Sequence, residues 1–299
     1  MNVSAWIGAF RPRTLPLALS SVTTGGILAA AQGKFDSLVF GLCCLTTILL
    51  QVLSNLANDY GDSVNGADHA GRKGPGRAVQ TGVISASSMR TAIAVFVALC
   101  LGSGISLLIA AFGFNYRLLF VFLGLGILCI AAAILYTMGK RPYGYAGLGD
   151  LSVLVFFGGV GVTGSLFLFT QSWDAPSLLM ALAIGLFSVG VLNINNIRDI
   201  ESDRQAGKYS IPVRLGRAKA GIYHWFLLIA GLLSAIVYTV LTFRSPTQFL
   251  FLLALPLFVV IGKAVSTKPS SELDPYLKRM ALSTLLFVLL FGIGQWFAA

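Results

Sequence analysis

The sequence predicts an all-α membrane protein, a bundle of nine transmembrane helices that forms one domain over residues 1–299. Of the 299 residues, 56% are hydrophobic and only 11% are charged, and the mean hydropathy is +0.83. A soluble protein of this length needs more charge to cover its surface. Nine apolar runs of at least 18 residues come close to the roughly 20 residues that a membrane-spanning helix needs. The runs are residues 14–33, 36–58, 91–116, 118–139, 151–173, 175–197, 220–243, 245–262 and 280–299.

In chain order, these runs are joined by loops of unequal length. The first run follows Arg11 and Arg13 without the cleavage-site pattern of a signal peptide, so we expect a retained helix. The connections after the first, third, fifth and seventh runs are very short. Those after the second and sixth runs, residues 59–90 and 198–219, are long, polar and contain glycine.

The basic residues predict the orientation in the membrane. With nine spans, the N-terminus and the loops after even-numbered spans share one side, which carries 18 of the 21 Lys and Arg residues. The other side carries only Lys34, Arg117 and Arg244. The positive-inside rule therefore places the N-terminus in the cytoplasm and the C-terminus outside. The net charge of +10 is mainly topological; contact with membrane lipids fits it, and nothing indicates nucleic acid.

Acidic residues are concentrated in the two long connections, which contain six of the eleven in the chain. Solubilising charge would be spread more evenly, so this clustering indicates a site. The two segments also resemble each other, because "NDYGD" (58–62) aligns with "NNIRD" (195–199), four spans apart. Such spacing suggests an internal duplication with two helix-end motifs facing one cavity.

Helical spacing places each acidic motif on one face. Asn55, Asn58, Asp59 and Asp62 are spaced i, i+3, i+4, i+7, and Asn195, Asp199 and Asp203 are spaced i, i+4, i+8. Ionisable groups at membrane depth usually face a bundle interior and mark function. Two carboxylate faces would repel each other unless a cation lay between them, and carboxylate oxygens suit Mg²⁺, which bridges phosphate oxygens.

Basic residues follow both motifs. Arg72, Lys73 and Arg77 lie in the run "GRKGPGR", and Lys208 and Arg214 follow the second motif. These side chains can neutralise a phosphate held by the acids and Mg²⁺, although each taken singly is equally explained as an ordinary cytoplasmic base.

Two further segments on the same side have two possible roles. "YTMGKRPYGYAGLGD" (136–150) contains Lys140, Arg141 and Asp150 and can line the site or only turn the chain. "FRPRTLP" (10–16) can anchor the chain at the interface or form a pocket wall. A metal site of Cys or His is not indicated, because the four cysteines lie in apolar runs without a CxxC pair and the two histidines, His69 and His224, are far apart.

These motifs resemble the UbiA superfamily of intramembrane prenyltransferases, which carry two aspartate-rich motifs after helices 2 and 6 of a nine-helix bundle. The similarity is greatest to the branch that uses 1,4-dihydroxy-2-naphthoate. It is carried by "RPRTLPLAL" (11–19), "QVLSNLANDYGDSVNGAD" (51–68), "GPGRAVQTGVI" (74–84), "YTMGKRPYGYAGLGDLSVLVFFG" (136–158) and "VLNINNIRDIESDRQAGKYSIPVRLG" (191–216). Residues after 216 resemble it only in hydropathy. Gly66 stands where other branches have the last acid of the first motif, and Asp68 is the nearest carboxylate.

The resemblance implies transfer of a polyprenyl group from its diphosphate to 1,4-dihydroxy-2-naphthoate with loss of CO₂, giving demethylmenaquinone, at the cytoplasmic side of a bacterial inner membrane. It implies Mg²⁺ as cofactor and Asp59, Asp62, Asp199 and Asp203 as catalytic metal ligands, joined by Asp68. The implied diphosphate contacts are Asn58, Asn195, Lys73, Arg77, Lys208 and Arg214. Lys140, Arg141 and Asp150 are candidates to hold the aromatic acid.

Three alternatives remain. A secondary transporter would also contain acids, broken helices and repeats, but these acids lie at helix ends with loop bases beside them. A CDP-alcohol phosphatidyltransferase would carry a D-G-x-x-A-R motif, which this chain lacks. Within the resembled family, the acceptor could be 4-hydroxybenzoate or another quinone precursor.

Overall fold

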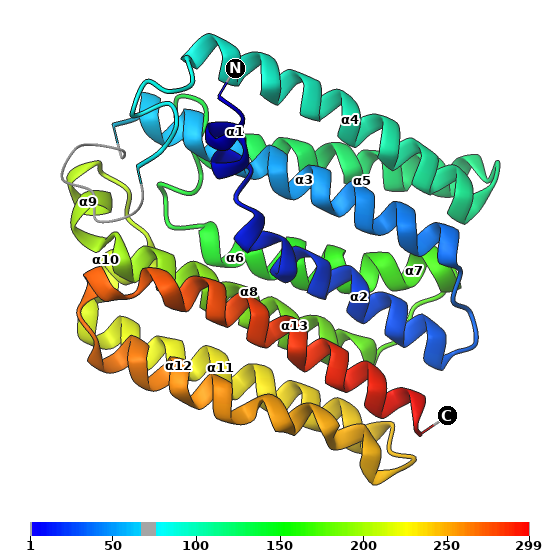
Figure 1. The fold of residues 1–299 in the computed structure, drawn as a ribbon. Helices are drawn as coiled ribbons and strands as arrows, with labels where there is room; N and C mark the ends of the chain where they lie inside the picture. The colour runs from blue at the N-terminus through cyan, green and yellow to red at the C-terminus, as the bar shows by residue number, and fades with distance from the viewer. Residues whose placement is uncertain (1, 67–75, 299) are drawn as a thin grey trace.

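A computed structural model describes residues 2–66 and 76–298, and all its regular secondary structure in these ranges is helical (Figure 1). Nine of the described segments are long and apolar enough to cross a membrane, which confirms an all-helical protein with nine candidate membrane-spanning helices. In chain order the elements are α1 (Val3–Phe10), α2 (Leu15–Ala31), α3 (Ser37–Val64), α4 (Ala86–Phe112), α5 (Tyr116–Leu135), α6 (Gly149–Val153), α7 (Ser165–Thr170), α8 (Ser177–Arg198), α9 (Ile200–Gln205), α10 (Ile211–Leu215), α11 (Arg217–Leu241), α12 (Leu255–Thr267) and α13 (Asp274–Trp296).

Several spans are not regular α-helices from end to end. A 3₁₀ turn, Pro12–Thr14, joins α1 to α2, and π-helical turns, Leu154–Gly164, join α6 to α7 into one span. A longer 3₁₀ segment, Pro246–Ala254, leads into α12, and a short one, Ser270–Glu272, precedes α13. Departures from α-helical geometry are frequent at functional sites, because they re-aim side chains within a span.

Local sequence determines where helices begin. The side chain of Asp36 accepts hydrogen bonds from two backbone N–H groups of the first turn of α3, and Ser85 and Asn115 cap α4 and α5 in the same way. Such caps satisfy N–H groups that have no partner within the helix. Pro16 and Pro275 lie in the first turns of α2 and α13, where a missing N–H costs nothing.

The helices form two groups with α2 and the α6–α7 span between them (Figure 1). One group is α3, α4 and α5, and the other is α8, α11, α12 and α13. Small residues allow close approach where α8 meets the α6–α7 span. A Cβ added at Gly158 would lie 2.5 Å from the carbonyl oxygen of Ala181, and one at Gly185 would lie 2.7 Å from the side chain of Leu154. Close backbone contact of this kind drives helix association in membranes.

The two groups differ in how tightly they are packed. Within the second group, Phe187 and Phe258 stack with ring centroids 4.7 Å apart, and Phe287 meets both rings edge-on. In α5, by contrast, Ile130 is the one buried residue. The second group thus contains most of the main hydrophobic core, and α5 lies at the periphery.

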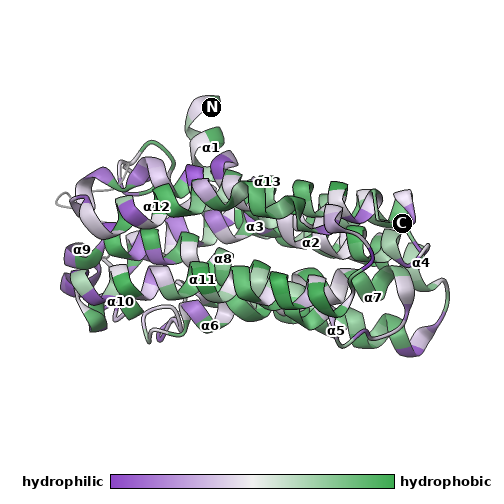
Figure 2. Ribbon diagram, turned by 90° about the horizontal axis from the view of Figure 1, so that it is seen from below, coloured by the Kyte–Doolittle hydropathy of each residue, from purple (hydrophilic) through white to green (hydrophobic). Residues whose placement is uncertain are grey.

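Polar residues gather at the end of the bundle that carries α1, α9 and α10, whereas the C-terminus lies at the other end (Figure 2). The second span extends further into the predicted 59–90 loop than expected: α3 continues to Val64, so Asp59 and Asp62 lie in its last turns. The sixth span ends at Arg198, one residue beyond the expected run, and Asp199 is its C-cap. Asp203 lies in the separate short helix α9, so the second motif does not continue as one helix, in contrast to the predicted i, i+4, i+8 face.

Candidate active site

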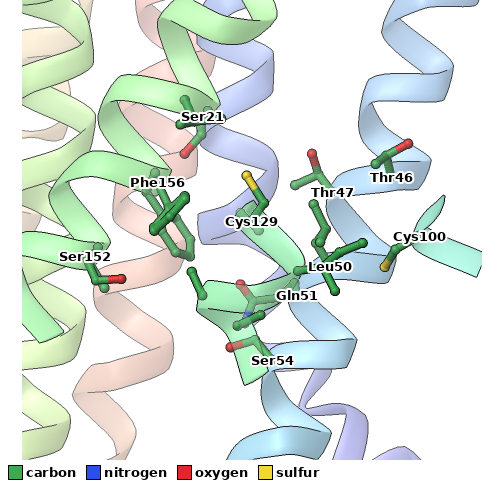
Figure 3. A pocket seen from close by; sticks show the side chains of 18 of the residues that line it. Ser21, Thr46, Thr47, Leu50, Gln51, Ser54, Cys100, Cys129, Ser152 and Phe156 are labelled. Atoms are coloured by element: carbon green, nitrogen blue, oxygen red, sulfur yellow. The ribbon is translucent and has the colours of Figure 1, made fainter. Parts of the chain in front are cut away.

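A cavity of about 410 Å³ lies within the bundle, with polar residues at one end and an apolar interior. Side chains of α2, α3, α4, α5, α8 and the α6–α7 span line it. Its midsection is shown in Figure 3, where Gln51 and Ser54 of α3 lie on one side and Ser152 and Phe156 on the other. The residues at its polar end include Arg11, Arg13, Asn55, Asn58, Asp62, Arg77, Tyr136, Tyr143, Asn195 and Lys208, and those of its interior include Val22, Leu107, Phe122 and Leu168.

Asp62 is the carboxylate of the first motif that reaches this cavity. It is 2% exposed, and its Oδ2 accepts a hydrogen bond from Nη1 of Arg77 at 2.6 Å. Its Oδ1 accepts one from the Tyr145 hydroxyl at 2.8 Å. The same Nη1 of Arg77 donates to the backbone carbonyl of Asn58 at 2.7 Å. Charge-assisted hydrogen bonds of this kind fix a buried carboxylate in one orientation.

Asp59 has a different environment on the same buried face. Its two carboxylate oxygens accept hydrogen bonds from the backbone N–H groups of Ala78 and Val79, each at 3.1 Å. Among the described residues, Asp59 is not part of the cavity wall. Its carboxylate thus fixes the segment after Arg77 against α3, which brings Arg77 to Asp62.

The loop after α5 packs directly against the first motif. The Thr137 hydroxyl lies 3.0 Å from the carbonyl oxygen of Ala57 and 3.1 Å from Oδ1 of Asn58. This contact needs a glycine at position 61, because an added Cβ there would lie 2.6 Å from the backbone of Thr137. Of the two roles considered for residues 136–150, the structure supports both: Tyr136 and Tyr143 line the cavity while the loop turns the chain.

Lys208 joins the two motifs. Its Nζ is 3.5 Å from Oδ1 of Asp203 and 4.0 Å from Oδ2 of Asp62, and the residue is 5% exposed. Burial lowers the pKa of Lys208, but the two carboxylates outweigh this effect and hold the pKa above its ordinary value. The sequence indicated that a cation must lie between the two acidic faces, and in this structure the chain itself supplies one.

Asp203 is left with unfavourable electrostatics. Burial raises its pKa from 3.8 to about 6; the neighbouring carboxylates of Asp199 and Asp62 add to the rise, and Lys208 opposes it. Its Oδ2 is buried and has no hydrogen-bond partner among the described residues. Buried polar atoms without partners are rare and call for an explanation, such as a missing ion.

Asp199 is held by its neighbour Arg198. Nε and Nη2 of Arg198 donate to its two carboxylate oxygens at 2.8 and 2.7 Å, and Nη2 also donates to Oδ1 of Asn195 at 2.8 Å. Nη1 of Arg198 pairs with Asp274 at the start of α13, and Asp274 in turn pairs with Arg13 at 2.9 Å. Asn195 and Arg13 line the cavity.

Four predicted site residues lie elsewhere. Arg214 is exposed and donates to the carbonyls of Tyr209 (3.0 Å) and Ala146 (2.7 Å), so the structure does not bring it to the cavity but uses it to join two loops. Lys140 and Arg141 are exposed and are not among the described lining residues. Asp150 accepts a hydrogen bond from the Tyr223 hydroxyl at 2.9 Å, away from the cavity wall. Asp68, Arg72 and Lys73 lie outside the described residues.

The sequence pattern of the UbiA prenyltransferase family matches residues 18–285, most of the chain. The chain belongs to the UbiA prenyltransferase family. It is 49% identical over 298 residues to the 1,4-dihydroxy-2-naphthoate octaprenyltransferase of Haemophilus influenzae, covering 98% of this chain and 96% of that one. It is 45% identical over 307 residues to the Escherichia coli enzyme of the same name, covering 99% and 98%. The predicted family and the predicted similarity to its dihydroxynaphthoate branch are thereby confirmed.

A solved structure shares the UbiA fold. The structure of a UbiA homolog from Archaeoglobus fulgidus bound to DMAPP and Mg²⁺ superposes with a TM-score of 0.63 at 16% identity, covering 96% of this chain and 99% of that one. At this identity the likeness concerns the fold alone.

The donors in this UbiA-family site fit Mg²⁺ chemically. Within the described ranges, no three Asp, Glu, His or Cys side chains are arranged as a ready metal site. Instead, carboxylates of the two motifs converge on Lys208, and Oδ2 of Asp203 accepts no hydrogen bond from the part of the chain that the structure describes. Carboxylate oxygens are the ligands that Mg²⁺ prefers in proteins, so Asp62 and Asp203 are the members of the predicted set best placed to share one.

The sequence reasoning missed Tyr145, Arg198 and Asp274 as site residues of this UbiA protein. The position of Tyr145 in a glycine- and tyrosine-rich loop on the side of the motifs could have indicated its role. Arg198 could have been identified as the single base inside "NNIRD". Asp274 had no such signal, since its neighbours carry no motif and only packing brings α13 to α8.

Proposed function

We propose that this protein transfers a polyprenyl group from polyprenyl diphosphate to 1,4-dihydroxy-2-naphthoate, releasing diphosphate and the carboxyl group as CO₂, and giving demethylmenaquinone in its reduced (quinol) form. The observation that carries the proposal is the approach of Asp62 and Lys208 at the polar end of a cavity whose interior is apolar, with Asp203 paired to Lys208 outside the described cavity wall. The names of the Haemophilus and Escherichia relatives support the choice of acceptor.

The two ends of the cavity suit the two parts of the donor substrate. Arg77 and Lys208 present positive charge where a diphosphate would lie, with Asn58 and Asn195 beside them. Residues such as Leu107 and Phe122 offer apolar surface to the prenyl chain. Lys73 as a further diphosphate contact, and Lys140, Arg141 and Asp150 as contacts of the aromatic acid, stay predictions, as does Arg214.

Mg²⁺ is part of the proposal, supported by the Archaeoglobus homolog, which was solved with DMAPP and Mg²⁺. When bound, it supplies positive charge that stabilises the departing diphosphate. Asp62 and Asp203 would hold it, with Asp199 close by, and Asp59 and Asp68 stay predicted ligands. Asp59 would first have to release the backbone N–H groups that it now binds.

The residues of the chain contribute in three ways. Arg77 and Lys208 would neutralise the diphosphate as the bond between its oxygen and the prenyl carbon breaks. The apolar interior of the cavity would keep water away from the allylic cation until the electron-rich ring forms the new carbon–carbon bond. The polar end of the cavity would face the cytoplasm of a bacterial inner membrane, as the distribution of basic residues suggests.

A purified-enzyme assay tests the proposal. With Mg²⁺ and polyprenyl diphosphate, the protein should prenylate dihydroxynaphthoate and release CO₂, while 4-hydroxybenzoate serves as the competing acceptor. Asp62→Asn and Asp199→Asn should each abolish transfer without loss of the folded protein, and excess chelator should stop the reaction until Mg²⁺ is restored. Retained transfer in both variants would refute the site, and transport of a solute into liposomes without any prenylation would favour the transporter.

A further inference from the structure

A chain of alternating charges connects three parts of the sequence behind the second motif. Arg13 pairs with one oxygen of Asp274, the other oxygen of Asp274 pairs with Arg198, and Arg198 pairs with both oxygens of Asp199. Its four members come from the turn before α2, the start of α13 and the end of α8. The two bases and two acids sum to zero charge.

Arg198 is the centre of this chain and is almost fully buried, with a side chain 1% exposed. A buried guanidinium needs both charge partners and hydrogen-bond acceptors. Asp199, Asn195 and Asp274 together supply them. Asn195 lines the cavity, so the orientation of Arg198 also sets the position of a cavity wall residue.

Asp274 decides how the charge of Arg198 is shared. With Asp274 present, Arg198 is divided between two carboxylates, so it compensates Asp199 less completely than it would if it paired with Asp199 alone. Without it, Arg198 would neutralise Asp199 alone, and the chain of charges would sum to +1. A more positive second motif attracts a divalent cation less strongly.

We propose that Asp274 is a positioning residue, which acts through Arg198 to keep Asp199 and Asn195 oriented and negatively charged enough for a divalent cation. The inference rests on the proposed Mg²⁺–diphosphate site. It assigns a role in that site to α13, a helix in which the sequence contains no motif. Partners that orient metal ligands typically change metal affinity 10- to 100-fold when removed.

Ligand-dependent stability of the purified protein in detergent or nanodiscs tests this role without turnover. Thermal unfolding would be followed while Mg²⁺ is titrated at a fixed concentration of inorganic pyrophosphate. Because a ligand that binds the native state raises its stability, the titration midpoint reports affinity. Asp274→Asn should need roughly tenfold more Mg²⁺ than the unchanged protein for the same stabilisation. Asp274→Glu, which keeps the carboxylate, should retain most of the Mg²⁺ affinity of the unchanged protein.

Glu272, two residues before Asp274, provides a matched control for the loss of one carboxylate. Glu272 pairs with Lys268 on the surface, with 53% of its side chain exposed, and it is not part of the four-membered chain of charges. Glu272→Gln removes one carboxylate charge from the same turn and should leave the Mg²⁺ titration unchanged. A midpoint for Asp274→Asn equal to that of Glu272→Gln would overturn the inference.

Arg13→Gln provides an independent test with the opposite sign. It removes a positive charge from the same chain and leaves Asp274 to Arg198. Because Arg13 also lines the cavity, this titration is run at saturating pyrophosphate; the Mg²⁺ midpoint should then be no higher than that of the unchanged protein, and a tenfold rise would overturn the inference. This variant also decides the question if Asp274→Asn does not fold. If Mg²⁺ and pyrophosphate fail to stabilise even the unchanged protein, the proposed Mg²⁺–diphosphate site is wrong, and the role of Asp274 in that site is wrong as well.

Discussion

Replacing Asp203 with asparagine is expected to stabilise the protein at neutral pH although it removes a proposed metal ligand. The carboxylate is 3% exposed and surrounded by Asp199 and Asp62, with Lys208 as its near base. Asparagine has nearly the same shape and carries no charge. The variant therefore removes the cost of keeping a carboxylate ionised in this position.

The pKa gives the size of the effect. Burial, with the two neighbouring acids, raises the pKa of Asp203 from 3.8 to about 6. Each tenfold difference in proton affinity between the native and unfolded chain corresponds to about 1.4 kcal/mol, so the ionised form costs about 3 kcal/mol above pH 6. Between about pH 4 and 6 the native protein binds more protons than the unfolded chain, and its stability falls as the pH rises.

The assay is the free energy of unfolding by denaturant titration between pH 4 and 8, in detergent without Mg²⁺. Asp203→Asn should be more stable than the unchanged protein by up to about 3 kcal/mol at pH 7, and the difference should vanish near pH 4. Added Mg²⁺ with pyrophosphate should stabilise the unchanged protein and have little effect on the variant. Prenyl transfer by the variant should fall sharply.

Two results would refute this reasoning. One is a variant that is no more stable than the unchanged protein at pH 7. The other is a gain in stability that is the same at pH 4 and pH 7, because only the ionised carboxylate carries the cost. Glu272→Gln, which removes a surface carboxylate, controls for the general loss of one negative charge.

Two further predictions concern the loop between α5 and α6. Gly147 has a φ of +82°, and an added Cβ would lie 2.6 Å from the carbonyl oxygen of Tyr209, so Gly147→Ala should separate two loops of the site and reduce prenyl transfer. Gly33 is the control position, with a similar φ of +68° but open space around it. Gly33→Ala should lower the unfolding free energy by only about 1 kcal/mol and leave prenyl transfer intact. Equal prenyl transfer by the Gly147→Ala and Gly33→Ala variants would contradict the proposed contact. Tyr145→Phe removes the hydroxyl that donates a hydrogen bond to Asp62 at 2.8 Å. We expect the unfolding free energy to fall by about 1.5–3 kcal/mol and the Mg²⁺ concentration needed for transfer to rise. An unchanged Mg²⁺ titration would show that Asp62 is oriented without this hydroxyl.

The helices and the buried face of the first motif were predictable because both depend on local sequence, whereas the break between α8 and α9 at Asp199 was not. Apolar runs long enough to span a bilayer mark the helices. The spacing of Asn55, Asp59 and Asp62 marks one buried face, and all three are at most 3% exposed in the structure. The end of α3 was less predictable, because a helix that continues past its apolar run into polar sequence has no hydropathy signal.

Pairings between distant residues could not be predicted in this way. From the sequence, Arg77 and Arg214 were both predicted to bind the diphosphate, and the pattern did not favour one over the other. Packing of the segment after Arg77 against Asp59 brings Arg77 to the cavity, whereas Arg214 bonds to two carbonyls at the surface. Which base meets which acid depends on loop conformations that no spacing rule encodes.

The pairing of acids with bases follows from the need to compensate three buried carboxylates, those of Asp62, Asp199 and Asp203. Asp62 is neutralised by Arg77, Asp199 by Arg198, and Lys208 is shared between Asp62 and Asp203. Of these three carboxylates, Asp203 has the weakest compensation, because its pKa is raised and its Oδ2 has no hydrogen-bond partner among the described residues.

A cation that arrived with a diphosphate would enter where this compensation is poorest. If Asp62 and Asp203 turned to that cation, Arg77 and Lys208 would lose their carboxylate partners just as an anionic ligand became available to them. Exchange of partners keeps every buried charge compensated before and after binding, which a site of carboxylates alone could not achieve. On the proposed function, the loop bases therefore serve both states: they stabilise the acids when the site is empty and the diphosphate when it is filled.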